Sequence, residues 1–167
     1  GTALYNGEGN EYIYFPQGAI FYIPFAKLPF ALSEIIWRLI CLGLLAYALV
    51  RFCDLAPSQH RDLFFLVMTI ICLALGYSSL RNGQFNLIIV SAGLLSVRFA
   101  RDKKWWWCAL VLSIGFALKP TMIVLLLLML ALYRPLWWHI PLLLVGFILL
   151  PFLTQSPSYV LSQYHAM

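Results

Sequence analysis

Long apolar runs, separated by short polar turns, dominate the sequence and limit the folds that it can adopt. Hydrophobic residues make up 63% of the 167 residues and charged residues only 10%, whereas soluble domains carry about 25% charged residues. A membrane-crossing helix needs about 20 predominantly apolar residues. The sequence therefore predicts an all-α, polytopic transmembrane helical bundle, with residues 1–167 as a single membrane domain. The runs expected to cross the membrane without a break are 31–52, 63–80, 85–100 and 136–153.

The stretch 18–30 is also apolar, but Pro24, Lys27 and Pro29 interrupt it. Each proline restricts the residue before it, and 13 residues are too few for a regular span. We therefore expect a short re-entrant or interfacial segment here. Residues 1–11 and 154–167 are polar and are expected to form loops.

The run from 105 to 133 contains Lys119-Pro120 and permits two interpretations. It could form one kinked helix of 29 residues with Lys119 near its middle. Alternatively, it could form a hairpin of two short helices that turns at Lys119-Pro120. Helices of about 14 residues rise only ~21 Å, less than the ~30 Å hydrocarbon core. The hairpin therefore requires tilt, a protein-lined cavity or a locally thinner bilayer. With this run included, we expect about five spanning segments.

The distribution of cations favours the hairpin and sets the orientation, because cytoplasmic loops carry an excess of Lys and Arg. With the hairpin, and with loop 98–104 in the cytoplasm, seven cations lie inside and four outside; the single helix gives six against five. The inside cations are Arg51, Arg61, Arg98, Arg101, Lys103, Lys104 and Arg134, and the outside cations are Lys27, Arg38, Arg81 and Lys119. The same count places Glu8, Glu11, Tyr14, Pro16, Glu34, Gln84 and the tail 159–165 on the non-cytoplasmic face.

Polar side chains gathered on one membrane face suggest a site for an anionic, hydroxyl-rich ligand, because ionisable groups at a membrane edge are functional candidates by default. Arg81 and Lys119 suit a phosphate, since Arg forks onto phosphate oxygens and Lys neutralises them as a point charge. Gln84 and Asn86 offer donors and acceptors for sugar hydroxyls. The alternatives are a solvated hairpin loop over 79–86, a snorkelling Lys119, and a mutually neutralised Glu34–Arg38 pair on one helix face.

The remaining polar residues show no pattern of a metal site or a disulfide framework. The four cysteines are scattered singly, without a Cys-x-x-Cys pair, and the three histidines lie far apart. The net charge of +5 is better explained by membrane topology than by nucleic-acid binding. The sequence also lacks a glycine-rich phosphate loop. We therefore expect no metal, no cofactor and no nucleic-acid partner.

Several short motifs occur in a characteristic order. Tyr14-Phe15-Pro16 is followed by Pro24-Phe25-Ala26-Lys27-Leu28-Pro29 and a helix that carries Trp37. Gly83-Gln84-Phe85-Asn86 comes next, and then Gly115-Phe116-Ala117-Leu118-Lys119-Pro120, a leucine run and Arg134. Across nearly the whole chain, this order and spacing resemble glycosyltransferase family 87, polyprenyl-phosphate-sugar-dependent membrane mannosyltransferases and relatives of the GT-C class. That family usually shows Tyr-Pro-Pro, a Gly-Gln-x-Asn turn and Lys-Pro, so Phe15 is a departure.

The resemblance implies an inverting hexosyltransferase of the bacterial plasma membrane with an extracytoplasmic active face. It would transfer a hexose, expected to be mannose, from a polyprenyl-phosphate-linked donor to a lipid or glycan acceptor. The donor phosphate and sugar would bind Arg81, Gln84, Asn86 and Lys119, supported by Tyr14, Pro16 and Arg38. The family's catalytic acid lies in an external loop upstream of Gly1, so the chain is expected to be an inactive fragment that lacks earlier and later helices. Glu8, Glu11 and His165 are the remaining catalytic candidates within it.

Two other functions are compatible with the same features. A lipid or polysaccharide transporter or flippase would also show broken helices and membrane-edge cations, but it should carry an internal repeat, and none is found. A non-catalytic membrane scaffold would use the polar turns structurally. In that case Arg81, Gln84 and Lys119 would scatter in space instead of converging.

Overall fold

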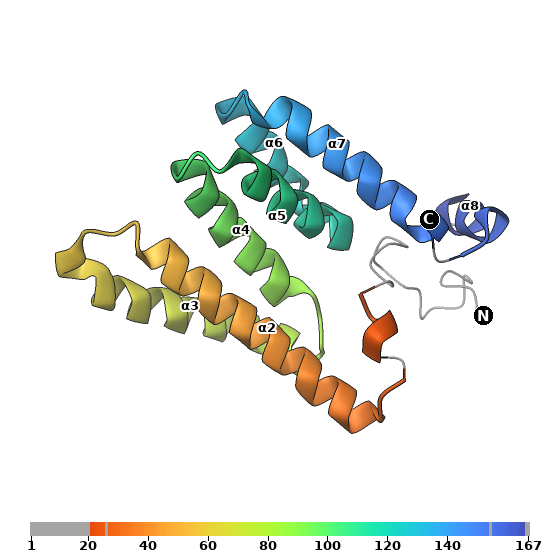
Figure 1. Ribbon diagram of the computed structural model, residues 1–167. Helices are drawn as coiled ribbons and strands as arrows, with labels where there is room; N and C mark the ends of the chain where they lie inside the picture. Colours follow the sequence, from red (N-terminus) through yellow and green to blue (C-terminus); the bar gives the residue numbers. More distant parts are fainter. Residues whose placement is uncertain (1–20, 26, 154, 166–167) are drawn as a thin grey trace.

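The computed structural model describes residues 21–25, 27–153 and 155–165, with side chains up to 162, and this part of the chain consists of helices and turns without a strand (Figure 1). The predicted all-α membrane bundle is confirmed. The elements in chain order are η1 (Ile23–Phe25), α2 (Phe30–Cys53), η2 (Ser58–His60), α3 (Arg61–Arg81), α4 (Asn86–Arg101), α5 (Trp105–Leu118), η3 (Pro120–Met122), α6 (Ile123–Leu132), α7 (Leu136–Leu149), η4 (Leu150–Leu153) and α8 (Pro157–His165).

Three helical stretches are long and apolar enough to cross a membrane, namely Phe30–Cys53, Ser58–Arg81 and Leu136–Leu153. The other helices of the bundle are shorter. α4 has 16 residues, α5 has 14 and α6 has 10, which correspond to roughly 24, 21 and 15 Å along the axis. Of the five expected segments, three therefore reach full length, and α4 and the α5–α6 pair fall short of the ~30 Å hydrocarbon core.

α5 and α6 form the predicted hairpin. Lys119 leaves the helix with an extended backbone, φ −147° and ψ 122°, as expected before a proline, and Pro120 begins η3. The rings of Trp105 and Tyr133, at the two ends of the run, have centroids only 5.5 Å apart. A continuous helix would separate these residues by roughly 42 Å. The single kinked helix is therefore wrong.

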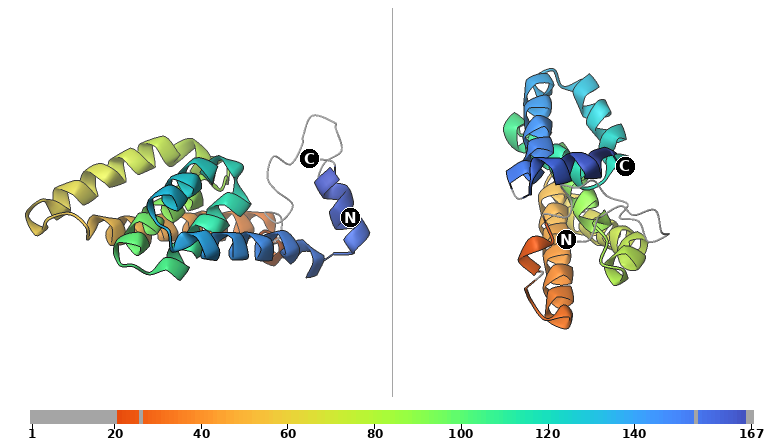
Figure 2. Two further views of the ribbon diagram at one scale, coloured as in Figure 1. Left: turned by 90° about the horizontal axis from the view of Figure 1, so that it is seen from above. Right: turned by 90° about the vertical axis from the view of Figure 1, so that its right-hand side faces the viewer.

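α4 forms the centre of the bundle. It packs against α2 on one side and α5 on the other, α5 packs in turn against α7, and Figure 2 shows α2 and α3 on the side opposite α6 and α7. Small residues permit close approach: a Cβ added at Gly115 would meet the Met122 side chain at 3.2 Å. The buried hydroxyl of Ser91 is satisfied within its own helix, donating to the Leu87 carbonyl at 2.7 Å.

One cluster of buried apolar residues lies among α4, α5, α6 and α7, and a second joins α2 to the start of α4 and the end of α5. Trp37, Cys41 and Leu45 lie on one face of α2, four residues apart, which is the spacing of neighbours on a helix surface. They pack with Phe85, Leu87 and Leu118. Because Phe85 and Leu118 precede Asn86 and Lys119, this cluster fixes the ends of α4 and α5 on which the candidate site is built.

Two terminal segments differ in detail from simple loops. In the expected re-entrant or interfacial stretch, the described residues form turns and the short η1 before α2 begins after Pro29. The tail was expected to be a polar loop, but Pro157–His165 forms the helix α8. Proline is well tolerated in the first helical turn, where its missing N–H is not needed, so Pro157 starts this helix where the composition suggests a loop.

Candidate functional site

The turn between α3 and α4 is closed by backbone bonds that bring its polar side chains together. The Gln84 N–H donates to the Ser79 carbonyl at 2.9 Å, and the Gly83 N–H donates to the Leu80 carbonyl at 3.3 Å. This is the Schellman pattern, in which a residue with left-handed backbone follows the helix. Gly83 has φ +64° and supplies that conformation without a Cβ penalty. The chain therefore reverses tightly, and Gln84 lies beside the last turn of α3.

Four polar side chains meet at this turn, and we call Ser79, Gln84, Asn86 and Lys119 the polar network. Asn86 is its centre. Its Nδ2 donates to Ser79 Oγ at 2.7 Å and to Gln84 Oε1 at 3.0 Å, and its Oδ1 accepts from Lys119 Nζ at 2.8 Å. Ser79 Oγ lies 3.5 Å from Gln84 Oε1. Residues from the ends of α3, α4 and α5 are thus joined at one point.

Lys119 brings an uncompensated positive charge to the network. The side chain is half-buried, and in the described part of the chain it has neither an ion pair nor a hydrogen bond apart from that to Asn86. An ammonium carries three donors, so two stay available. Asn86 is also the first residue of α4, where the helix dipole favours negative charge. A lysine and a helix N-terminus at the same place favour an anion.

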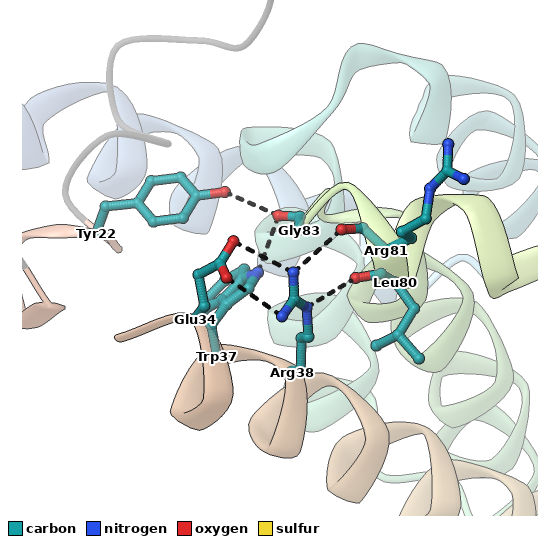
Figure 3. A network of polar contacts seen from close by, with 7 residues as sticks. All are labelled: Tyr22, Glu34, Trp37, Arg38, Leu80, Arg81 and Gly83. Carbon is teal, nitrogen blue, oxygen red and sulfur yellow. Dashed lines mark hydrogen bonds and ion pairs between the residues drawn. The ribbon is translucent and has the colours of Figure 1, made fainter. Parts of the chain in front are cut away.

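Helix α2 holds the turn through its own side chains (Figure 3). Trp37 Nε1 donates to the Gly83 carbonyl at 2.9 Å, and the Tyr22 hydroxyl reaches the same oxygen at 3.5 Å. Arg38 donates from Nε to the Leu80 carbonyl at 3.4 Å and from a terminal nitrogen to the Arg81 carbonyl at 3.2 Å. The Leu80 and Arg81 carbonyls lie in the last turn of α3, where a helix leaves its carbonyls without the usual partner four residues later, and the Gly83 carbonyl lies in the turn itself. The Leu80 carbonyl also accepts from the Gly83 N–H. We call Trp37 and Arg38 the α2 clamp.

Glu34 supports the α2 clamp by forming an ion pair with Arg38 at 3.2 Å, one helical turn away. Both side chains are exposed by about a third or more, so the pair stabilises the fold little by itself. Its effect is to orient the guanidinium toward the end of α3. The rings of Trp37 and Phe85 meet edge to face at 5.3 Å, which fixes the indole from the other side.

An apolar cavity of about 190 Å³ borders the polar network between α2, α3 and α4. Ser79 and Asn86 are its polar lining residues. Its other walls are apolar side chains or glycine: Leu45, Ile71, Cys72, Leu75, Gly76, Leu87 and Val90. The site therefore combines a cationic, hydrogen-bonding end with a hydrocarbon-lined space.

The structure brings together three of the four residues predicted to bind the donor. Gln84, Asn86 and Lys119 share the polar network, and Arg38 supports the turn. Arg81 does not join them: its side chain is exposed and points away from the turn (Figure 3). Tyr14, Pro16, Glu8 and Glu11 lie outside the described residues, as does the side chain of His165.

Sequence reasoning did not assign a role to Ser79, Tyr22 or the indole N–H of Trp37. Ser79 closes the network, although its only signal is a hydroxyl at the polar end of an apolar run. The Trp37 bond to Gly83 depends on how α2 crosses α4, which the local sequence does not encode. Among the described residues, no group of three or more His, Cys, Asp or Glu side chains could hold a metal ion.

Comparison with known proteins gives one match. The model of a family described as glycosyltransferase family 87 matches residues 12–166. No curated protein matches the chain, and no solved structure matches it. The match covers both apolar clusters, the polar network and the α2 clamp.

Proposed function

The chain belongs to glycosyltransferase family 87 and is a membrane glycosyltransferase, and from this premise we propose that it transfers a hexose from a polyprenyl-phosphate-linked donor. We propose mannose as the hexose, a lipid or glycan as the acceptor, and the extracytoplasmic face of a bacterial plasma membrane as the place of transfer. The single observation that carries this proposal is the 2.8 Å bond between Lys119 and Asn86 beside the apolar cavity.

The proposed reaction builds negative charge on a leaving phosphate. An acceptor hydroxyl oxygen attacks the anomeric carbon, the bond from that carbon to the phosphate oxygen breaks, and its electron pair leaves with the polyprenyl phosphate. Inversion follows from attack on the opposite face. Lys119 Nζ would stabilise the leaving phosphate with the donors that Asn86 does not use. Preorganised charge of this kind is usually the largest contribution to catalysis.

The cavity supports a lipid-linked donor over a soluble one. A soluble sugar nucleotide offers no hydrocarbon to fill an apolar space, whereas a polyprenyl chain leaves its phosphate at the boundary between hydrocarbon and polar groups. Gln84 supports sugar recognition, because its Oε1 is engaged by Asn86 while its Nε2 has no bond within the described residues. That amide could donate to a sugar hydroxyl.

The proton of the acceptor hydroxyl requires a general base, a role worth roughly 10²–10⁴-fold in rate. We propose a carboxylate from the external loop for this role, in keeping with the family resemblance. Glu34 lies on the same side of the bundle as the polar network, but it is paired with Arg38. We therefore assign Glu34 to positioning and not to proton transfer.

The test is transfer from radiolabelled polyprenyl-phosphate mannose into membrane lipid, in membranes that carry the full natural length of the protein. We expect Lys119→Met, Asn86→Ala and Gln84→Ala to lose most of the transfer while still inserting. Lys27→Met, which removes an exposed lysine without a contact to the polar network, should retain it. Arg81→Ala is an independent arm that reports whether the exposed guanidinium meets the donor during turnover.

Two results would contradict the proposal. If all three network variants transfer sugar as well as the wild type, these residues are ordinary turn and helix-end groups. No transfer by the wild type from any lipid-linked sugar would remove the proposed donor class, and lipid transport would then become the leading hypothesis.

A further inference from the structure

Two loops lie close together at the end of the bundle opposite the polar network, and aromatic rings in or beside these loops are in contact. The α4–α5 loop and the α6–α7 loop lie side by side at the upper left of Figure 1. The rings of Trp105 and Tyr133 are 5.5 Å apart, and those of Trp106 and His139 meet edge to face, also at 5.5 Å. We call this surface the basic end. It includes the exposed residues Arg101, Lys103, Lys104, Trp106, Arg134 and Trp138.

The basic end has a charge that its own fold does not neutralise. The one acid in these two loops, Asp102, is engaged by Arg98 at 3.1 Å in an i,i+4 pair. Arg101, Lys103, Lys104 and Arg134 make no side-chain hydrogen bond or ion pair within the described residues, and all four are exposed. Like charges held close together destabilise a fold unless counter-charges reach them, so this end is suited to bind anions.

An apolar groove begins beside these cations. A cavity of about 300 Å³ between α6 and α7 is lined by Leu130, Ala131, Trp137 and Pro141. Arg134 lies in the loop between the two helices that form it. The indole N–H of Trp137 donates to the Leu130 carbonyl at 2.8 Å and so fixes one wall. Trp138 next to it is 85% exposed, as is common for indoles at the boundary between hydrocarbon and headgroups.

We infer that the basic end binds an anionic phospholipid. Its phosphate and headgroup lie against Arg134 and the lysines of the α4–α5 loop, and one acyl chain occupies the groove along α6 and α7. Clusters of basic residues between transmembrane helices bind anionic headgroups in this way. A soluble phosphate or a nucleic acid would leave the groove unused. This inference involves no sugar transfer and does not depend on the proposed function.

Native mass spectrometry of the full-length protein in detergent tests the inference, with phosphatidylglycerol and phosphatidylcholine as probes. We expect the wild type to retain phosphatidylglycerol in preference to phosphatidylcholine. Arg134→Gln and Lys104→Gln should each lower its retention about fivefold, the effect of one cation near an anionic surface. The control Lys27→Gln removes a cation outside the basic end and should retain the lipid as the wild type does.

A second pair of variants distinguishes lipid binding in the groove from general electrostatic attraction to the basic end. Ala131→Trp fills the groove without changing charge and should reduce phosphatidylglycerol retention, whereas Ala46→Trp on the exposed face of α2 should not. Equal retention of both lipids by the wild type would overturn the inference. So would equal effects of Lys27→Gln and Arg134→Gln, unchanged binding by Ala131→Trp, or complete displacement of the lipid by glycerol 3-phosphate.

Discussion

At the scale of single residues, the site depends on how Asn86 uses both ends of its amide. The carbonyl oxygen accepts from the Lys119 ammonium and the nitrogen donates to Ser79 and Gln84. The amide therefore positions a lysine without neutralising it, which a carboxylate in the same place could not do. The positive charge stays available for a substrate.

This leads to a prediction for Asn86→Asp. The carboxylate would form an ion pair with Lys119 and lose the donors to Ser79 and Gln84, so we expect protein that folds but transfers roughly tenfold to a hundredfold less sugar, the range for hydrogen bonds to charged groups. Transfer measured at saturating acceptor checks this. Activity equal to the wild type would show that the charge of Lys119 is not used.

The backbone at Gly83 gives a second prediction. A Cβ here would make an ordinary contact with the Trp37 side chain at 3.9 Å, without a clash. However, φ is +64°, which costs about 1 kcal/mol or more for an L-residue with a Cβ. Gly83→Ala should therefore lower the thermal unfolding midpoint in detergent, whereas Gly43→Ala, in open space within α2, should not. An unchanged midpoint for Gly83→Ala would refute the strain.

At the scale of elements, α2 acts as a rigid support that fixes the α3–α4 turn from outside. Trp37 and Arg38 are neighbours on one helix turn, and together they contact three parts of the turn, at Leu80, Arg81 and Gly83. The polar network is thus positioned by a helix that contributes no residue to it.

Trp37→Phe tests this support. The substitution keeps an aromatic ring against Phe85 but removes the N–H that donates to Gly83, a loss of about 1 kcal/mol in stability. We expect sugar transfer to fall while insertion is retained, and the Michaelis constant for the donor should rise. Phe25→Leu, which changes a different ring packed on Trp37, serves as the comparison. Unchanged donor kinetics for Trp37→Phe would show that the α2 clamp does not position the site.

The α5–α6 hairpin is tested through its glycine contact. Gly115→Leu would place atoms where Met122 now lies, because even a lone Cβ at this position would come within 3.2 Å of that side chain. Overpacking of this kind typically costs about 1–3 kcal/mol. We expect a lower unfolding midpoint that Met122→Ala partly restores. An unchanged unfolding midpoint for Gly115→Leu would contradict the close packing of α5 against η3.

Much of this organisation could be predicted from the sequence, for physical reasons. The run 31–52 matches α2, Phe30–Cys53, within a residue at each end, because charges and prolines mark where apolar burial stops. Lys119-Pro120 indicates a break in the run 105–133. The distribution of cations between the two membrane faces favours the hairpin over the single helix, and the structure confirms the hairpin. The outward direction of Arg81 could not be predicted, because a side chain at a helix end follows the tertiary contacts of the turn. The helix α8 was missed because Pro157 is read equally well as a loop residue.

At the scale of the whole molecule, the two ends of the bundle differ in chemistry. One end holds the polar network and the α2 clamp, and the other holds the basic end with its exposed tryptophans. From the positive-inside rule we expect the basic end to face the cytoplasm. We propose that the polar network faces the extracytoplasmic side and that lipid-linked sugars are used there.

Equilibrium binding of radiolabelled polyprenyl phosphate is the sharpest test of the proposal that Lys119 and Asn86 hold the phosphate of a lipid-linked sugar. We expect the wild-type protein to bind and Lys119→Arg, which keeps the charge, to retain part of the affinity. Lys119→Met and Asn86→Asp should each lose affinity roughly tenfold or more. Equal affinity for all four proteins would contradict it.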